Sequence, residues 1–132
     1  MESKKRTSVG SGTKWEAMAG YTRAVRVGDV IHVSGTTATD ENGNLVGGAN
    51  AAEQARYAIQ KIERAINALG GSLRDVVRTR VFVSDINHWE SVARVHGEFF
   101  QNIRPVNTLV QAKLVGAEYL VEIEAEAIVG QQ

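Results

Sequence analysis

Three glutamates alternate with apolar residues along the last strand-like segment of the chain. Glu122, Glu124 and Glu126 therefore project from the same side of any strand that contains them. A partly buried carboxylate at such a position has a raised pKa, and it can orient or deprotonate an attacking water molecule. The other interpretation is a solvated strand face on which the glutamates pair with Arg78 and Arg80 of a second strand. The alternation leaves both interpretations open, with Glu122 as the candidate catalytic residue.

Five further residues are candidates for binding a small molecule. Tyr21 can stack on a flat ligand, or it is an ordinary half-buried strand tyrosine. Ser34 and Gly35 can offer a hydroxyl group and a close backbone approach, or they simply end a strand. Arg104 can bind an anion and Asn107 can hydrogen-bond a ligand. Their structural alternatives are a charge near a helix C-terminus and a polar residue that starts a strand.

Several kinds of chemistry are disfavoured by the composition. The 132 residues include no cysteine, so thiolate catalysis, disulfides and cysteine metal sites are excluded. The histidines His32, His88 and His96 lack the spacing of a metal site, and the glycines lack the pattern of a nucleotide cradle, so we expect neither metal nor cofactor. Fifteen basic residues balance fifteen acidic ones, so no strong overall field attracts a nucleic acid or a membrane, and we expect neither as a partner. No apolar run approaches the ~20 residues of a membrane span, and the polar N-terminus is unlike a secretory signal, so we expect a cytoplasmic protein.

The apolar periodicity predicts one α+β domain. Residues 1–12 are polar and rich in Ser, Gly and Lys, and we expect a flexible tail there, followed by one domain over residues 13–132. Asn50 has the character of an N-cap, and a helix should run from it to the Gly70–Gly71 pair. A second helix should follow Asp85 or Asn87 and end before Pro105. The expected strands cover residues 21–27, 30–34, 76–84, 107–114 and 119–129, giving the order ββαβαββ.

This order predicts two layers, with two helices on one face of a mixed sheet. Strands that are separated by a helix are candidates for parallel neighbours joined by a right-handed crossover. The opposite face of the sheet would then expose apolar residues such as Phe82, Val110 and Ala112. A single sheet with an apolar free face is usually covered by another subunit, so we expect an oligomer.

Five segments in order resemble the Rid family, also called the YjgF or endoribonuclease L-PSP family. Gly20–Tyr21–Thr22–Arg23–Ala24–Val25 resembles the family's G-P-Y-S-Q-A-V, and Val33–Ser34–Gly35 its V-S-G. Residues 72–77, the Phe99–Phe100 pair and Val121–Glu122–Ile123–Glu124–Ala125 resemble its S-L-x-D-V-V, F-F and V-E-I-E-A segments. The resemblance implies a chorismate-mutase-like fold and a homotrimer whose sheets form a central barrel, with small molecules bound in clefts between subunits. It also implies hydrolysis of reactive enamines and imines without metal or cofactor, with Glu122 near the attacking water.

The sequence departs from the family pattern where an arginine normally clamps the substrate carboxylate. That position falls on Asn107, or on Val106 if one residue is inserted in the following turn. Arg104 precedes the proline, and Arg23, which replaces a glutamine, is a further candidate for the lost positive charge. We therefore expect a deaminase-like hydrolase of imines, enamines or related C–N compounds. The alternative is a trimer that binds or senses a small metabolite without catalysis, and the lack of a basic aromatic surface stripe disfavours an endoribonuclease.

Overall fold

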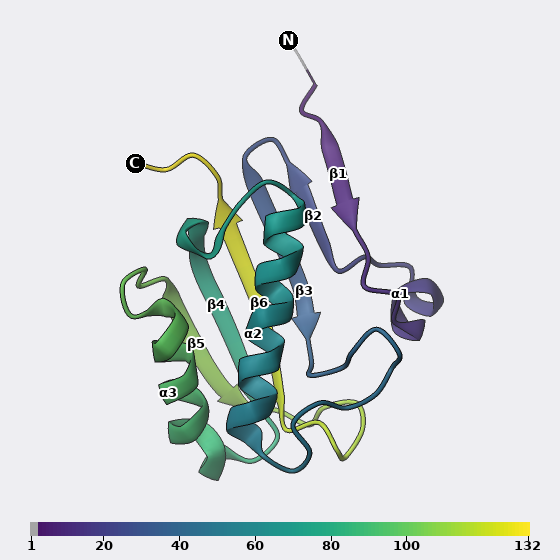
Figure 1. The fold of residues 1–132 in the computed structure, drawn as a ribbon, viewed down its shortest axis with the longest axis vertical. Coiled ribbons are helices and arrows are strands. Elements are labelled where there is room, and N and C mark those ends of the chain that lie inside the picture. The colour runs from purple at the N-terminus through teal and green to yellow at the C-terminus, as the bar shows by residue number, and fades with distance from the viewer. Residues whose placement is uncertain (1–2) are drawn as a thin grey trace.

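The strands form one mixed six-stranded sheet in the order β1-β2-β3-β6-β4-β5 (Figure 1). The fold is taken from a computed structural model, which describes residues 3–132. The strands are β1 (Arg6–Val9), β2 (Ala24–Val27), β3 (Val30–Thr36), β4 (Val76–Val83), β5 (Val106–Gln111) and β6 (Val121–Ile128). The helices are α1 (Lys14–Ala19), α2 (Ala51–Ala68) and α3 (Trp89–Phe100), with short 3₁₀ turns at Leu73–Asp75 and Ile86–His88. The predicted α+β class and the ββαβαββ order are therefore present, with one strand and one short helix added before them.

The pairing of the strands follows from the helices that connect them. β4 and β5, joined through α3, are parallel neighbours, as the sequence predicts for strands separated by a helix. β3 and β4, joined through α2, are not neighbours, because β6 lies between them and is antiparallel to both. The final strand therefore occupies the middle of the sheet, where it is buried between two partners.

The N-terminal segment differs from the expected flexible tail. Arg6–Val9 forms β1, which pairs antiparallel with β2 in a register that joins Arg6 to Val27 and Val9 to Ala24. The prediction of a tail over residues 1–12 is thus wrong for these residues, because the open edge of β2 supplies the backbone partners that a polar segment lacks on its own. Residues 1–2 lie outside the described part of the chain.

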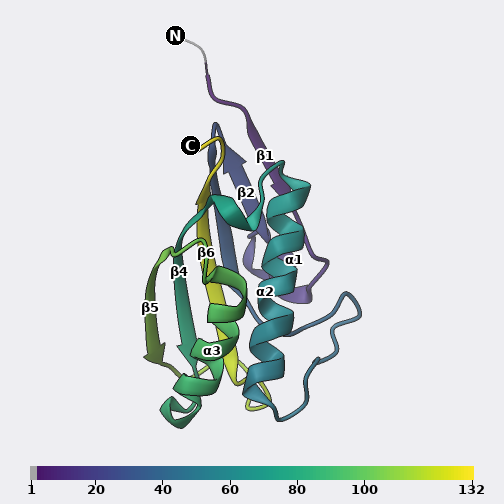
Figure 2. The same cartoon turned by 60° about the vertical axis from the view of Figure 1, so that its left-hand side comes forward.

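The two long helices cover one face of the sheet, and Figure 2 shows them in front of the strands on the same side. α2 begins where predicted, since the Asn50 side chain accepts a hydrogen bond of 3.0 Å from the backbone N–H of Glu53. It ends at Ala68, and Gly70 follows with a φ of 87°, the left-handed conformation that glycine adopts without steric cost.

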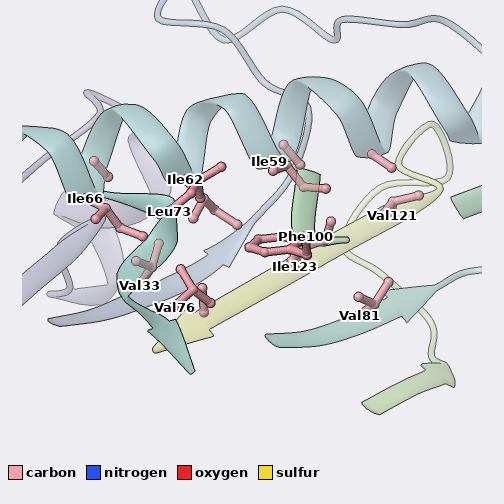
Figure 3. Packing of buried hydrophobic residues seen from close by; sticks show 14 of the residues in the cluster. Val33, Ile59, Ile62, Ile66, Leu73, Val76, Val81, Phe100, Val121 and Ile123 are labelled. Atoms are coloured by element: carbon pink, nitrogen blue, oxygen red, sulfur yellow. The ribbon is translucent and has the colours of Figure 1, made fainter. Parts of the chain in front are cut away.

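The core lies between these helices and the sheet. Ile59, Ile62 and Ile66 of α2 point toward Val33 and Ile123 of the sheet (Figure 3). Each of these side chains is almost completely buried, and each contributes roughly 1.5–3 kcal/mol relative to an exposed position. This packing fixes α2 over β3 and β6, the two strands that position the candidate site.

The other face of the sheet has charged residues at its centre and apolar residues toward one edge. Arg80 of β4 is paired in register with Glu124 of β6, and Phe82 with Val110 of β5. Val106 and Val110 are exposed to 58% and 42% in the single chain. Among residues 3–132, no helix is long and apolar enough to cross a membrane.

Candidate active site

A cavity of about 240 Å³ lies beside α1, at the end of β3 and the start of β6. Its wall combines apolar and aromatic side chains with a few polar ones. Trp15 and Tyr119 meet edge to face at 6.1 Å between ring centroids, and the exposed residues Met18 and Val115 contribute to the lining. Glu122 also contributes to the lining. A mostly apolar cavity with few convergent polar groups is typical of small-molecule sites.

Glu122 differs from the other glutamates of β6 because it faces no cation across the sheet. Its partner in register on β4 is Phe82. Glu124 lies 3.3 Å from Arg80, and Glu126 lies 3.5 Å from the same guanidinium group. The cross-strand ion pairs predicted as the structural alternative therefore exist for Glu124 and Glu126. Within residues 3–132 they do not include Glu122, whose carboxylate is left to the cavity.

Burial raises the pKa of Glu122 above its ordinary value of 4.5. The negative charge of Glu124 raises it further, and the positive charge of Arg23 opposes both effects. A carboxylate with a raised pKa is a better base than an exposed one, because its conjugate acid holds a proton more tightly. The environment of Glu122 therefore makes its carboxylate more basic than an exposed one.

Gly35 makes room for this carboxylate. A Cβ atom built on Gly35 would lie 3.0 Å from the carboxyl carbon of Glu122. The register between β3 and β6 also shifts between Val33 and Thr36, a bulge that places Gly35 against β6. The close backbone approach predicted for Gly35 thus serves a protein side chain, that of Glu122.

Arg23 is buried beneath the cavity and is held by four groups. Its Nη1 donates to the backbone oxygen of Gly35 at 2.6 Å and to Thr36 at 3.1 Å. Its Nε donates to Ser11 at 3.3 Å, and its Nη2 donates to Glu16 at 3.3 Å. These bonds use most of the five N–H groups of a guanidinium. Arg23 therefore fixes the backbone beside Glu122 and has little capacity left to clamp a ligand.

Glu16 of α1 neutralises Arg23. Burial disfavours its charged form, but hydrogen bonds from Ser11 and Thr13 and the charge of Arg23 lower its pKa from 4.5 to about 2. The pair is almost inaccessible to solvent, since Glu16 and Arg23 are 8% and 4% exposed. A buried ion pair whose remaining acceptors are satisfied by hydrogen bonds holds its geometry firmly. It connects α1 to the residue just before β2, and both residues of the pair lie next to the cavity wall formed by α1.

Lys61 reaches the same region from the buried side of α2. It is 7% exposed, and its Nζ donates a hydrogen bond of 2.8 Å to the backbone oxygen of Thr39. Burial and then the nearby charge of Arg23 lower its pKa from 10.5 to about 8. Lys61 thus adds a second buried cation to the lining of the cavity.

The remaining candidates from the sequence divide into two groups. Tyr21 and Gly35 line the cavity with Glu122, and so does Arg23. Ser34 does not line it, because its side chain lies on the open face of the sheet, where Oγ donates to the backbone oxygen of Thr22 at 2.6 Å.

Asn107 and Arg104 also lie away from this cavity in the single chain. Asn107 donates a hydrogen bond of 2.9 Å to Thr79, whose hydroxyl group is also 2.8 Å from Nε2 of His96. Arg104 has a φ of 59°, and its Nε donates to the backbone oxygen of Gln101 at 3.0 Å. Both polar side chains are thus engaged locally. In the described part of the chain, no cluster of three or more His, Asp or Glu side chains is arranged to hold a metal ion.

The fold and the cavity together define a two-layer α+β protein in which a half-buried carboxylate, without an ion-pair partner among residues 3–132, lines a small cavity. Comparison with known proteins gives the family. The profile described as endoribonuclease L-PSP matches residues 12–129, and the chain belongs to this family, which includes the YjgF and Rid proteins.

Three relatives show how far the similarity extends. The chain is 33% identical to the 3-aminoacrylate deaminase RutC of Acinetobacter baylyi, over 83% of this chain and 87% of that protein. It is 44% identical to Rv2704 of Mycobacterium tuberculosis, a YjgF/YER057c/UK114 family member whose crystal structure matches with a TM-score of 0.85 over 95% of this chain and 100% of that one. The Escherichia coli YjgF gene product is 25% identical, with a TM-score of 0.80 over 94% of this chain and 99% of that one.

Proposed function

We propose that this protein hydrolyses reactive imines, enamines or related small C–N compounds in the cavity at Glu122. The observation that carries the proposal is the carboxylate of Glu122, which has a raised pKa and no ion-pair partner among residues 3–132. The 33% identity to a protein named as a 3-aminoacrylate deaminase supports the same reaction class.

The reaction needs one base that later acts as an acid. Glu122 accepts a proton from a water molecule while the water oxygen attacks the carbon of a protonated imine, forming a carbinolamine. Glu122 then returns the proton to the nitrogen, and the C–N bond breaks. The carboxylate next takes the remaining hydroxyl proton and passes it to the departing ammonia, so that a carbonyl compound and an ammonium ion leave. An enamine enters the same path after it is protonated on carbon. Because the water supplies the oxygen, atoms and charges balance without a redox partner.

The other residues of the cavity orient the substrate. Tyr21, 40% exposed, presents an aromatic face for a flat C=N compound, and the guanidinium of Arg23 lies 5.8 Å from the centroid of its ring. Gly35 keeps the Glu122 carboxylate in place. In our proposal Ser34, Asn107 and Arg104 act only where a neighbouring subunit brings them to a cavity, since they do not line it within one chain.

We also propose that the active form is a homotrimer in which the open sheet faces form a central barrel. The exposed apolar residues Val106 and Val110, the second of which is paired with Phe82, support the burial of this face. Clefts between subunits would then enclose the cavity further and exclude water from all but the reacting position.

Replacement of Glu122 tests the proposal. Glu122→Gln removes the base and keeps the size of the side chain, so the hydrolysis of an imine generated in situ by an amine oxidase should fall by at least about a hundredfold. Glu126→Gln is the matched control on the same strand, because Glu126 is ion-paired on the open face. Full activity in Glu122→Gln would show that the carboxylate is structural.

The second candidate function is binding of a small metabolite without turnover. The specific observation in its favour is that Arg23, which lines the cavity, is neutralised by Glu16. Its guanidinium therefore has no free pair of N–H groups to bind a substrate carboxylate. Saturable ligand binding together with no acceleration of imine hydrolysis by the wild type would establish this function in place of the first.

A further inference from the structure

A second cavity, of about 210 Å³, adjoins the Glu122 cavity at Arg23 and Lys61. Its wall is formed by the chain after β1, by Thr39 and Glu41, and by one side of α2 with Tyr57 and Arg64. Arg23 and Lys61 line both cavities. The hydrolysis proposed above uses no residue that lines only this second cavity.

Positive charge accumulates around this cavity. Lys61 and Arg64 are three residues apart, so both lie on one side of α2. The ion pairs found within residues 3–132 include neither of them. Arg64 instead places its guanidinium 5.4 Å from the ring centroid of Tyr57. Stacking of this kind uses the face of the guanidinium and leaves the N–H groups in its plane able to donate hydrogen bonds.

Lys61 has unused hydrogen-bonding capacity at this position. An ammonium group carries three N–H donors, and the hydrogen bond to Thr39 uses one of them. A buried cation without a paired anion is costly, and the lowered pKa of Lys61 reflects this cost. The neighbouring charges are Arg23, Glu16, Arg64 and Asp40.

The acidic groups nearby do not cancel this charge. Glu16 is committed to Arg23 and to the hydrogen bonds from Ser11 and Thr13. Asp40 accepts hydrogen bonds from the backbone of Asn42 and Asn44 in its own turn. Glu41 lines the cavity but is exposed to solvent, where its charge is largely screened. The centre of the cavity therefore carries a net positive charge from two cations on one helix.

We propose that this second cavity binds a small anion with at least two charged oxygen atoms, held by Lys61 and Arg64. The free donors of Lys61 contact one oxygen from the buried side, and the guanidinium of Arg64 contacts another from the open side. The ligand chemistry is that of a phosphate group or of a dicarboxylate, and this inference stands independently of the proposed hydrolase activity.

Titration calorimetry on the full chain tests the site. Inorganic phosphate and malonate are the two probes, each titrated at pH 7 against a chloride solution of equal ionic strength. We expect at least one of the two compounds to bind saturably, with one molecule bound per chain. Arg64→Gln should weaken it at least about tenfold, the loss expected for one charged hydrogen bond, and Lys61→Met should weaken it at least as much. Arg94→Gln on the exposed side of α3 removes the same charge elsewhere and should leave binding unchanged.

The outcomes distinguish the two ligand classes from each other and show whether the site exists. Binding of phosphate alone identifies a phosphate-type ligand, and binding of malonate alone identifies a dicarboxylate. Arg64 is exposed, so Arg64→Gln should fold even where Lys61→Met does not. No binding of either probe above the chloride control, or binding that survives Arg64→Gln unchanged, would overturn the proposal. Imine hydrolysis is measured in parallel on the same proteins. It tests the proposed activity at Glu122 separately from anion binding.

Discussion

The carboxylate of Glu122 lies against the backbone of Gly35, so closely that a Cβ atom at Gly35 would approach its carboxyl carbon to 3.0 Å. The two residues come from neighbouring strands, and the shifted register of β3 brings them together. Arg23 fixes the same backbone from below through its hydrogen bond to the oxygen of Gly35. The position of the proposed base is thus set by a glycine and an arginine that do no chemistry themselves.

Gly35→Ala should move the Glu122 carboxylate and leave the fold intact. The added methyl group meets the end of a flexible side chain, which yields at little cost, so the change in unfolding free energy should stay below about 1 kcal/mol. A displacement of about 1 Å at a catalytic group costs about a hundredfold in rate. The measurements are kcat/KM for imine hydrolysis and the midpoint of thermal unfolding.

Gly97→Ala provides the control for this variant. Gly97 lies within α3, and its added Cβ would meet only the Gln101 side chain at 4.0 Å. This variant should keep full activity and gain slight stability from the better helix propensity of alanine. If Gly35→Ala is as active as Gly97→Ala, the closeness of Gly35 to Glu122 has no catalytic meaning.

The pH dependence of hydrolysis should report the raised pKa of Glu122. The base acts when deprotonated, so kcat/KM should fall as the pH drops through a pKa above 4.5. Glu124→Gln removes a negative charge that disfavours ionisation of Glu122. The acid limb of the profile should therefore move to lower pH in this variant, and a pH–rate profile measures the shift.

Glu126→Gln distinguishes this local effect from a general change in charge. It alters the net charge as Glu124→Gln does, but the charge that raises the pKa of Glu122 is that of Glu124. We expect its acid limb to coincide with that of the wild type. Equal displacement in both variants would contradict a specific interaction between Glu122 and Glu124.

Much of the fold could be predicted from the sequence because the apolar periodicity is strong. The isoleucines of α2, its Asn50 cap and the Gly70 stop are local signals, and the structure confirms them. β1 could not be found this way, because three of its four residues are polar and the segment becomes a strand only through pairing with β2. The insertion of β6 between β3 and β4 depends likewise on packing across the whole sheet.

The candidate site was predicted less completely. Glu122, Tyr21 and Gly35 are recognisable from motifs, but Glu16 and Lys61 were missed although each had a signal. Thr13 and Glu16 have the S/T-x-x-E spacing of a capping box at the start of α1. Lys61 lies three residues after Ala58, on the apolar stripe of α2, where a lysine is unusual. The local bonds of Asn107 and Arg104 depend on side-chain geometry that spacing does not reveal.

The ion pair of Glu16 and Arg23 should make the protein sensitive to acid. Because the folded-state pKa of Glu16 is about 2 and its ordinary value is 4.5, its contribution is present above pH 4.5 and is lost as the pH falls toward 2. Glu16→Gln should therefore lower the unfolding free energy at pH 7 by on the order of 3 kcal/mol. The difference from the wild type should shrink as the pH approaches 2.

Urea unfolding at several pH values measures this difference. Glu118→Gln is the control, since Glu118 is an exposed glutamate outside the buried network. It should change stability by less than about 0.5 kcal/mol. A Glu16→Gln deficit that is the same at pH 7 and pH 3 would mean that the charge of Glu16 is not the source of the stabilisation.

The proposed trimer predicts a defined mass in solution. Light scattering should give three times the chain mass of 14.3 kDa. Val110→Asp places a charge on the open face beside Phe82 and should shift the mass toward that of one chain. Ile86→Asp, at an exposed residue outside the strands, is the comparison and should leave the assembly intact. A wild-type mass of a single chain would exclude both the barrel and the clefts between subunits.

The cations near Glu122 predict a preference among substrates. The guanidinium of Arg23 is occupied by Glu16, Gly35, Thr36 and Ser11, so it offers a substrate carboxylate no bidentate contact. Such a contact is worth about 1.5–3 kcal/mol, and its loss corresponds to tenfold or more in kcat/KM.

An imine derived from an amino acid should therefore be hydrolysed at least about tenfold less efficiently than the imine of the corresponding decarboxylated amine. Both can be generated in situ by oxidases, and the rate of imine loss is compared at matched enzyme concentration. The apolar wall around Trp15 and Tyr119 favours the uncharged compound for the same reason, since it offers a carboxylate no replacement for water. Equal rates would contradict this argument. If Lys61→Met then slowed only the carboxylated imine, the ammonium of Lys61 would be the missing clamp, reaching the substrate from the cavity wall that it shares with Glu122.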